Sequence, residues 1–248
     1  MNAIDQAIRK YLKEKSYKKI SLKAVLFDMD GVLYDSMPNH AESWTKIMRS
    51  YGFNMTEEEA YMHEGRTGDD TIRMISKREG KTVCAGERKR IYQEKTEAFS
   101  LCPVVSSMTG SAELLRKVAG NGLFAMLVTG SGQPSLLDRL NHDFPGIFIR
   151  ERMITSFDVK KGKPDPEPYL AALKKGRLMP DEAIVIENAP LGVEAAHAAG
   201  LFVIAVNTGP LPDYVLLDAG ANILLPSIEA LCNEWDPIFK CLNTTTLP

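Results

Sequence analysis

Cysteine is scarce in this 248-residue chain and follows no recognisable pattern. The four cysteines are scattered and form neither a CxxC pair nor the Cys/His spacing of a zinc site: Cys84, Cys102, Cys232 and Cys241. We therefore expect reduced thiols and a cytoplasmic protein.

Long apolar runs are also missing. The longest, such as "LFVIAV", have the length of a strand and fall far short of the ~20 residues that a membrane-spanning helix needs. The basic segment 1–20 has no apolar stretch after its charges, so it does not resemble a secretory signal. Its apolar residues recur at helical spacing and predict a helical extension over residues 1–21 that packs on the body of the protein: Ile4, Ala7, Ile8, Tyr11 and Leu12. Binding to a membrane surface or to a partner is the alternative for this helix, and overall we expect no membrane partner.

A surplus of one sign of charge is absent. The formal net charge is −2 and only 8% of the residues are aromatic, so the sequence offers no broad basic surface for nucleic acid. We expect a monomer without a nucleic-acid partner. The length allows one large domain or two smaller ones.

Short, nearly continuous apolar runs are present instead. "AVLF", "LFAMLV", "AIVI" and "FVIAV" are typical of strands that are buried on both faces. Helical patterns lie between them, and "SAELLRKVAG", "PEPYLAALKKG" and "LGVEAAHAAG" each end in the glycine that favours a helix C-terminus. We expect Asp165 to cap the second of these helices and Pro166 to begin it. This alternation predicts an α/β fold with a Rossmann-like parallel sheet covered on both faces.

One interval is too long for a single crossover. Roughly 95 residues separate Asp28 from the strand that starts at Leu123, whereas a crossover needs little more than a dozen. Within it, "HAESWTKIMRSYGF", "DDTIRMISKREG" and "GERKRIYQEKTEAF" have the pattern of amphipathic helices. We therefore expect an inserted α-helical cap domain at residues 36–104, with "SMPNH" and "LCPVV" as hinges. The core would comprise residues 22–35 and 105–242, and the final "NTTTLP" is expected to be a frayed tail.

Polar residues follow the ends of three predicted strands, where an open parallel sheet binds its ligand: Asp28 and Asp30, then Thr129, Gly130 and Ser131, then Glu187 and Asn188. Oxygen ligands of this kind suit Mg²⁺, and the hydroxyl and N–H groups of "TGSG" suit a phosphate. Lys163, in the loop "KKGKPDP", would allow a carboxylate to approach a phosphate. The set predicts phosphoryl transfer in which Asp28 is the nucleophile and Asp30 is the general acid and base.

Each of these motifs also has an ordinary structural interpretation. An Asp before Gly commonly forms a turn or a helix cap, Thr-Gly-Ser is commonly a loop, and Lys before Pro is commonly exposed. Glu-Asn-Ala-Pro is commonly a helix cap. The occurrence of all four at successive strand ends favours the catalytic interpretation.

These residues resemble the four signature motifs of the haloacid dehalogenase superfamily of phosphatases and phosphomutases. "DMDGV", the Thr in "LVTGS", the Lys in "KGKPDP" and "VIENAPLGVEAAHAAG" match motifs one to four, and the likeness runs from about Leu22 to the end of the last helix. It implies that Asp28 becomes an aspartyl phosphate and that Asp30 also offers its backbone carbonyl to Mg²⁺. Thr129 and Lys163 would bind the phosphoryl group, and the metal site would comprise Asp28, Asp30, Glu187 and Asn188. The helical insertion matches the cap of the β-phosphoglucomutase-like branch.

Two departures from that branch bear on the reaction. Asn188 stands where the mutases have Asp, and Glu64 and Gly68 stand where they have a Lys and an Arg that hold the distal phosphate. Glu64 would repel that phosphate. Arg66 could restore the contact or pair with Glu64, and a solvated surface pair is the ordinary alternative.

These departures favour hydrolysis, with Glu64 and Arg66 closing over a small substrate. Branch members that look similar act on inorganic pyrophosphate, which makes it the first expected substrate and a small sugar phosphate the second. A β-phosphoglucomutase-type mutase is the alternative reaction. A phosphometabolite-binding protein that has lost turnover is the alternative of a different class.

Two histidines complete the candidate residues. The mutases place a His at the hinge position that His40 occupies, so His40 would link cap closure to Asp30, unless it is only a residue of a helix first turn. His197 is expected on a helix face, away from catalysis.

Overall fold

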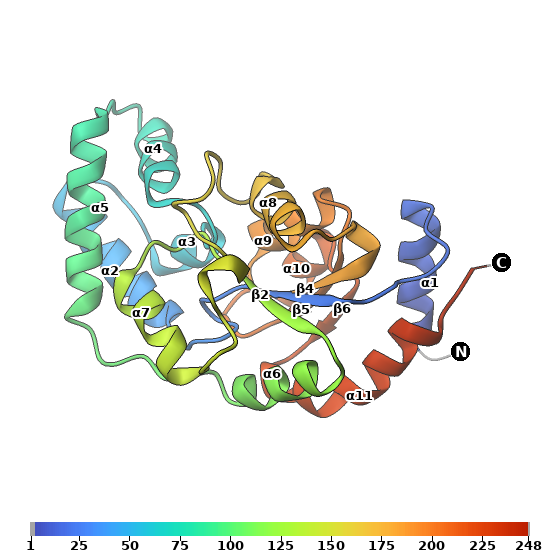
Figure 1. Cartoon of the computed structure of the whole chain (residues 1–248). Coiled ribbons are helices and arrows are strands. Elements are labelled where there is room, and N and C mark those ends of the chain that lie inside the picture. Colours follow the sequence, from blue (N-terminus) through green and yellow to red (C-terminus); the bar gives the residue numbers. More distant parts are fainter. Residues whose placement is uncertain (1–2, 248) are drawn as a thin grey trace.

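The core of the protein is a parallel sheet. The computed structural model describes residues 3–247 (Figure 1). Its six strands are ordered β3-β2-β1-β4-β5-β6 and are all parallel: β1 (Ala24–Phe27), β2 (Phe124–Val128), β3 (Met153–Ile154), β4 (Ala183–Glu187), β5 (Phe202–Val206) and β6 (Ile223–Leu225). The predicted α/β fold class is confirmed. The two short edge strands β3 and β6 were not expected from the sequence.

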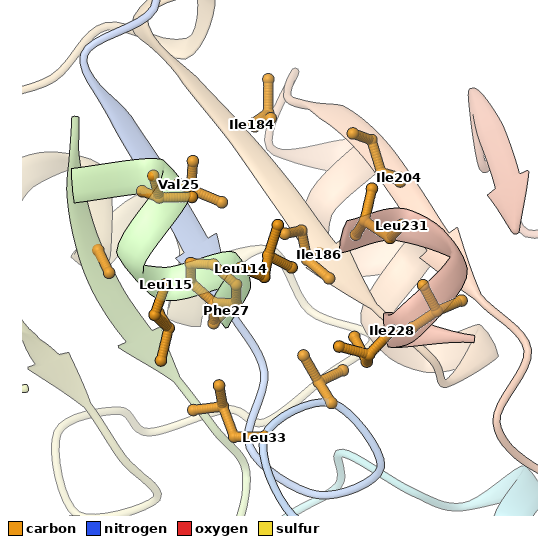
Figure 2. Close-up of a cluster of buried hydrophobic side chains, with 14 of the residues drawn as sticks. Val25, Phe27, Leu33, Leu114, Leu115, Ile184, Ile186, Ile204, Ile228 and Leu231 are labelled. Carbon is orange, nitrogen blue, oxygen red and sulfur yellow. The ribbon is translucent and has the colours of Figure 1, made fainter. Parts of the chain in front are cut away.

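Helices cover both faces of the sheet, as Figure 1 shows. Val25 and Phe27 pack on one face against α6 (Ser111–Gly120) and α11 (Ile228–Thr244), in the cluster drawn in Figure 2. Leu26 packs on the other face, which is covered by three helices: α8 (Glu167–Gly176), α9 (Pro190–Ala198) and α10 (Asp213–Asp218). Successive strand residues are buried on opposite faces of the sheet, so the strand sequences do not alternate between apolar and polar residues.

The remaining core elements are short. The helix α7 (Pro134–Asp143) follows β2 and packs its buried leucines into the first cluster. Two 3-10 turns lead into strands: η1 (Arg150–Arg152) before β3 and η2 (Pro180–Glu182) before β4. The side chain of Asp165 accepts the N–H of Glu167, but the helix α8 begins at Glu167 and not at the expected Pro166.

A group of four helices, here called the cap, lies between β1 and α6: α2 (Met37–Ser50), α3 (Glu57–Met62), α4 (Gly68–Arg78) and α5 (Ala85–Ser100). Their apolar residues form a cluster of their own, separate from the two clusters of the sheet. The short helix α3 was not predicted, although Thr56 and Glu59 form a capping box at its start. The division into domains stays a prediction.

One expected hinge contains the start of a helix. The segment "SMPNH" is largely helical, because α2 begins at Met37 directly after Ser36. Pro38 lies in the first turn of that helix, where a missing N–H costs nothing. The other expected hinge, "LCPVV" at 101–105, has no regular secondary structure beyond the end of α5.

The N-terminal helix α1 (Ala3–Lys15) packs on the core. Ile8, Tyr11 and Leu12 are buried, and the ring of Tyr11 meets Phe202 edge-on at 5.2 Å between centroids. The hydroxyl of Tyr11 donates to the carbonyl of Gly200 at 2.9 Å. The apolar face that prompted the membrane-surface alternative is therefore covered by the protein itself. No helix within residues 3–247 is long and apolar enough to cross a membrane.

The expectation of a frayed C-terminal tail is wrong for the residues that the structure describes. Thr245 donates its hydroxyl to Asp5 at 2.8 Å, and Arg9 donates to the carbonyl of Thr246 at 2.9 Å. The N–H of Leu247 donates to the carbonyl of residue 18 at 2.8 Å. Figure 1 shows the helix α1 and the end of α11 on the side opposite the cap. Pro248 lies outside the described residues.

Candidate active site

Three neighbouring strands bring the predicted polar residues together. Because β2, β1 and β4 are adjacent and parallel, Thr129, Asp28 and Glu187 meet at the carboxyl edge of the sheet. All three are buried, with at most 3% of their surface exposed. Gly130 and Ser131 follow Thr129, whose hydroxyl accepts the N–H of Ser131 at 2.9 Å.

Lys163 is the buried cation of this site. It comes from the loop before α8 and is 1% exposed. Its Nζ donates to Asp28 Oδ1 at 2.5 Å, to the Val128 carbonyl at 3.1 Å and to Glu187 Oε1. A buried lysine with two carboxylate partners stays charged, and these partners raise its pKa well above its usual value against the opposing effect of burial.

Glu187 holds Lys163 in place. Its Oε1 also accepts the hydroxyl of Tyr169 at 3.0 Å, and its Oε2 accepts the backbone N–H groups of Asn188 and Ala189 at 2.8 and 3.0 Å. A Cβ atom on Gly192 would lie 1.7 Å from Oε1, so only glycine leaves room for this carboxylate. Both oxygens of Glu187 are therefore engaged within the protein.

Asp30 is linked to the cap by a chain of hydrogen bonds. Ser36 donates to Asp30 Oδ1 at 2.5 Å, and His40 Nε2 lies 3.0 Å from the same oxygen. Lys95, on α5, donates to His40 Nδ1 at 2.6 Å. With Nδ1 as acceptor, His40 carries its proton on Nε2 and donates it to Asp30.

This network sets the protonation of Asp30. Burial alone would raise the pKa of Asp30, but the contacts with His40, Ser36 and Lys95 outweigh it and hold the pKa below its usual value. Burial lowers the pKa of Lys95 to about 7, and its ammonium group lies over the rings of Trp44 and Phe99 at 5.4 and 5.0 Å. The state of Asp30 thus depends on residues that the cap supplies.

Glu64 reaches the core from the cap. Its Oε1 accepts the side-chain N–H of Asn188 at 2.9 Å, and the residue is only 9% exposed. The next residue lies close to the core as well, because a Cβ atom on Gly130 would be 2.1 Å from the carbonyl oxygen of Gly65. The structure therefore has the cap closed on the strand ends, with Glu64 and not Arg66 in contact with Asn188.

A small cavity remains under the closed cap. It offers about 50 Å³ of space to the centres of water molecules, which corresponds to roughly four waters. Its lining combines core residues with cap residues, among them Asp30, Ser131, His40, Lys95, Glu64 and Arg66. All the predicted substrate-binding residues thus lie at or beside one cavity.

The electrostatics of the site fit a divalent cation. Burial raises the pKa of Asp28 to about 8 despite Lys163, and burial together with Asp28 raises the pKa of Glu64 well above its usual value. A cation among these carboxylates would restore their charged forms. Asn188 Oδ1 is buried and accepts no hydrogen bond within residues 3–247, so it is available as an oxygen ligand.

The donor set suits Mg²⁺ in particular. The described residues contain no group of three or more His, Cys, Asp and Glu side chains placed to hold a metal by themselves. Mg²⁺ commonly takes only one or two carboxylates and fills its remaining positions with other oxygens. Glu187 belongs to the predicted metal site, but both of its oxygens are engaged within the protein, which leaves the oxygens of Asp28, Asp30 and Asn188 for the metal.

Sequence reasoning missed Lys95, Ser36 and Tyr169. Lys95 has a detectable signal, because the buried face of α5 consists of Ile91, Lys95 and Phe99 at a spacing of four. A lysine on an apolar stripe is a candidate for a buried partner. His197 lies on α9 with Nε2 3.4 Å from Glu14, which agrees with its predicted place on a helix face.

The fold and the site together define an α/β enzyme whose polar groups lie at the carboxyl edge of a parallel sheet, beneath a helical cap. The chain belongs to the haloacid dehalogenase-like hydrolase family, whose model matches residues 25–206. The predicted family resemblance is therefore confirmed.

Several relatives are similar over most of the chain. The "Phosphorylated carbohydrates phosphatase" of Thermotoga maritima is 33% identical over 226 residues, which cover 85% of this chain and 97% of that protein. "Hexitol phosphatase A" of Escherichia coli is 33% identical and covers 75% of this chain and 83% of its own. A solved structure named "Putative beta-phosphoglucomutase" from Bacteroides vulgatus is 58% identical, with a TM-score of 0.95 and coverage of 98% and 99%. These relatives identify the β-phosphoglucomutase-like branch.

Proposed function

We propose that this protein is a Mg²⁺-dependent phosphohydrolase that works through an aspartyl phosphate on Asp28. The observation that carries the proposal is the buried Lys163, which binds Asp28 Oδ1. Asp30 lies two residues further along the chain, and its protonation depends on His40 and Lys95 of the cap. Asp28, Asp30 and Asn188 would hold the Mg²⁺. When bound, it would neutralise the charge that builds up between the carboxylates and the phosphoryl group.

The chain's own residues divide the chemistry between them. Lys163 binds Oδ1 of Asp28, which leaves Oδ2 to attack phosphorus. Asp30 is ionised in this network, so the proton that it passes to the leaving oxygen would reach it from Lys95 through His40. As a carboxylate it would then take a proton from the water that hydrolyses the aspartyl phosphate. The hydroxyl groups of Thr129 and Ser131 would bind the phosphoryl oxygens, and the cap over the strand ends would limit the access of bulk water.

The site supports a small substrate. Glu64 occupies space beside Asn188, and the remaining cavity has room for about four waters, so inorganic pyrophosphate is the first candidate. A small sugar phosphate is the second, because the relatives in Thermotoga maritima and Escherichia coli are named as phosphatases of phosphorylated carbohydrates and hexitols. Glu64 and Gly68 stand at the two cap positions where the mutases carry cations for the distal phosphate, and this replacement disfavours a mutase even though Arg66 lies nearby.

One panel of assays tests the proposal. The purified protein is incubated with Mg²⁺ and pyrophosphate, with β-glucose 1-phosphate plus its bisphosphate, and with small phosphomonoesters. We expect phosphate release that stops when EDTA removes the metal. Isomerisation to glucose 6-phosphate without phosphate release would show the mutase instead, and no turnover on the whole panel would favour a binding protein.

A pair of variants ties the activity to Asp28. Asp28→Asn should lower turnover by at least about a thousandfold, because it removes the nucleophile. Asp35→Asn is the matched control, because Asp35 is an exposed carboxylate nearby in the sequence. Retention of activity in Asp28→Asn would refute the covalent mechanism.

A further inference from the structure

The ammonium group of Lys163 is saturated with hydrogen bonds inside the protein. An ammonium group has three N–H donors. Within residues 3–247 all three are engaged: with Asp28 Oδ1 at 2.5 Å, with the Val128 carbonyl at 3.1 Å and with Glu187 Oε1. Lys163 can therefore donate to a phosphoryl oxygen only if it gives up one of these acceptors when the substrate enters.

Glu187 is the acceptor that Lys163 can leave at the lowest cost. Asp28 needs the contact, because Lys163 holds its Oδ1 and so leaves Oδ2 to attack phosphorus. Oε1 of Glu187 has a second donor, the hydroxyl of Tyr169 at 3.0 Å, and Oε2 is held by two backbone N–H groups. With Lys163 turned away, each oxygen of Glu187 still has a hydrogen-bond donor.

The position of Tyr169 makes it the group that keeps Oε1 satisfied. It lies in the first turn of α8, six residues after Lys163, and the ammonium group of Lys163 is 5.3 Å from the centre of its ring. Tyr169 and Glu187 are both fully buried, so bulk water does not reach this carboxylate. A buried charged oxygen that loses its last donor carries a larger penalty than an exposed one.

We propose that Tyr169 is a positioning residue that allows Lys163 to turn one N–H from Glu187 to the transferring phosphoryl group. The hydroxyl of Tyr169 stays on Glu187 Oε1, while the ammonium group keeps Asp28 Oδ1 and donates to a phosphoryl oxygen. This inference rests on the proposed phosphohydrolase. Tyr169 thus stabilises the anion-bound site more than the free site, in which Lys163 itself satisfies Glu187.

Binding of tungstate tests this role without turnover, because tungstate is a tetrahedral dianion of the same shape as a phosphoryl group. It is titrated in the presence of Mg²⁺ by calorimetry. Tyr169→Phe keeps the ring and removes only the hydroxyl, and we expect it to weaken binding about tenfold to a hundredfold. Tyr11→Phe is the matched control, because the buried hydroxyl of Tyr11 donates to the Gly200 carbonyl at 2.9 Å, away from the site. It should bind tungstate as the wild type does.

A double-mutant cycle shows whether Tyr169 acts through the charge of Glu187. Glu187→Gln replaces the anionic oxygen with a neutral amide, which loses less when it is left without a donor. In the Glu187→Gln background, Tyr169→Phe should therefore change the Kd of tungstate by no more than about twofold. Independent effects of the two substitutions would overturn the proposed role.

Kinetics with pyrophosphate separate positioning from a merely structural role. We expect Tyr169→Phe to raise KM about tenfold or more and to leave kcat within about threefold of the wild type, because the lost hydroxyl acts when the anion binds. A fall in kcat at unchanged KM would show a structural role and overturn the inference. Wild-type tungstate affinity in Tyr169→Phe, or an equal loss in Tyr11→Phe, would overturn it as well.

The outcomes distinguish the two proposals. A protein that hydrolyses pyrophosphate with the same KM in the wild type and in Tyr169→Phe would keep the phosphohydrolase and refute the role of Tyr169. A protein whose tungstate binding depends on Tyr169 but which turns over no substrate would keep that role and refute the phosphohydrolase.

Discussion

Closure of the cap should depend on the absence of a side chain at Gly162. A Cβ atom there would lie 2.8 Å from the backbone nitrogen of Thr67 and 2.9 Å from its methyl carbon, across the boundary between core loop and cap. The backbone of Gly162 does not have a positive φ, so alanine fits the loop itself. Gly162→Ala therefore creates a clash only with the closed cap.

The size of the effect follows from the geometry. An ordinary contact requires the turn to retreat by about 0.6 Å. The bond of 2.9 Å between Asn188 and Glu64 would then stretch to roughly 3.5 Å, beyond the usual range. Loss of a hydrogen bond worth about 1 kcal/mol lowers the ratio of closed to open molecules about fivefold, and misplacement of the cap groups can raise the loss in rate to about a hundredfold.

Steady-state kinetics measure the loss in rate, and thermal unfolding shows whether the variant remains folded. We expect kcat/KM of Gly162→Ala to fall between about fivefold and a hundredfold, with a melting temperature close to that of the wild type. Gly86→Ala is the control, because a Cβ atom there meets nothing within 4 Å and the substitution only favours the helix α5. Wild-type kcat/KM in Gly162→Ala would refute the reasoning, and so would an equal loss in Gly86→Ala.

Two further predictions concern stability. Because burial lowers the pKa of Lys95 from 10.5 to about 7, the penalty for its charge is full below about pH 7 and fades as the pH rises toward 10.5. The stability of the wild type relative to Lys95→Met should therefore rise with pH by up to about 1.4 kcal/mol per unit in that window, and parallel calorimetric curves from pH 6 to 9.5 would contradict it. Ile8→Ala, at a fully buried position of α1, should cost about 2 to 5 kcal/mol in urea unfolding, whereas the exposed Gln6→Ala should cost almost nothing; equal midpoints would show that α1 does not stabilise the core.

The strands and the core motifs could be predicted because their signals are local. A run such as "AVLF" is apolar because both faces of β1 are buried, and the residue after it lies at the edge where ligands bind. The edge strands β3 and β6 have only two and three residues, too few for a pattern to emerge. The same brevity hid the six-residue helix α3.

The cap contacts could not be derived from the sequence because they depend on distant residues. Glu64 and Asn188 are 124 residues apart, and their hydrogen bond exists only when the cap is closed. Lys95 and His40 are 55 residues apart, and only the packing of α2 against α5 brings them together. The order of helices predicts that the cap exists, but not which of its side chains enter the site.

The contact between the two terminal segments has a consequence for protein engineering. Lys19 pairs with Thr246 as a short antiparallel bridge, and Asp5 accepts a hydrogen bond from Thr245, on the side opposite the cap. A short peptide linker between the ends would therefore give a circular permutant. New ends opened at 101–105 would leave the cap attached to the core only through the connection before α2. Comparison of cap closure in this permutant and in the wild type would show how much the connection at 101–105 contributes.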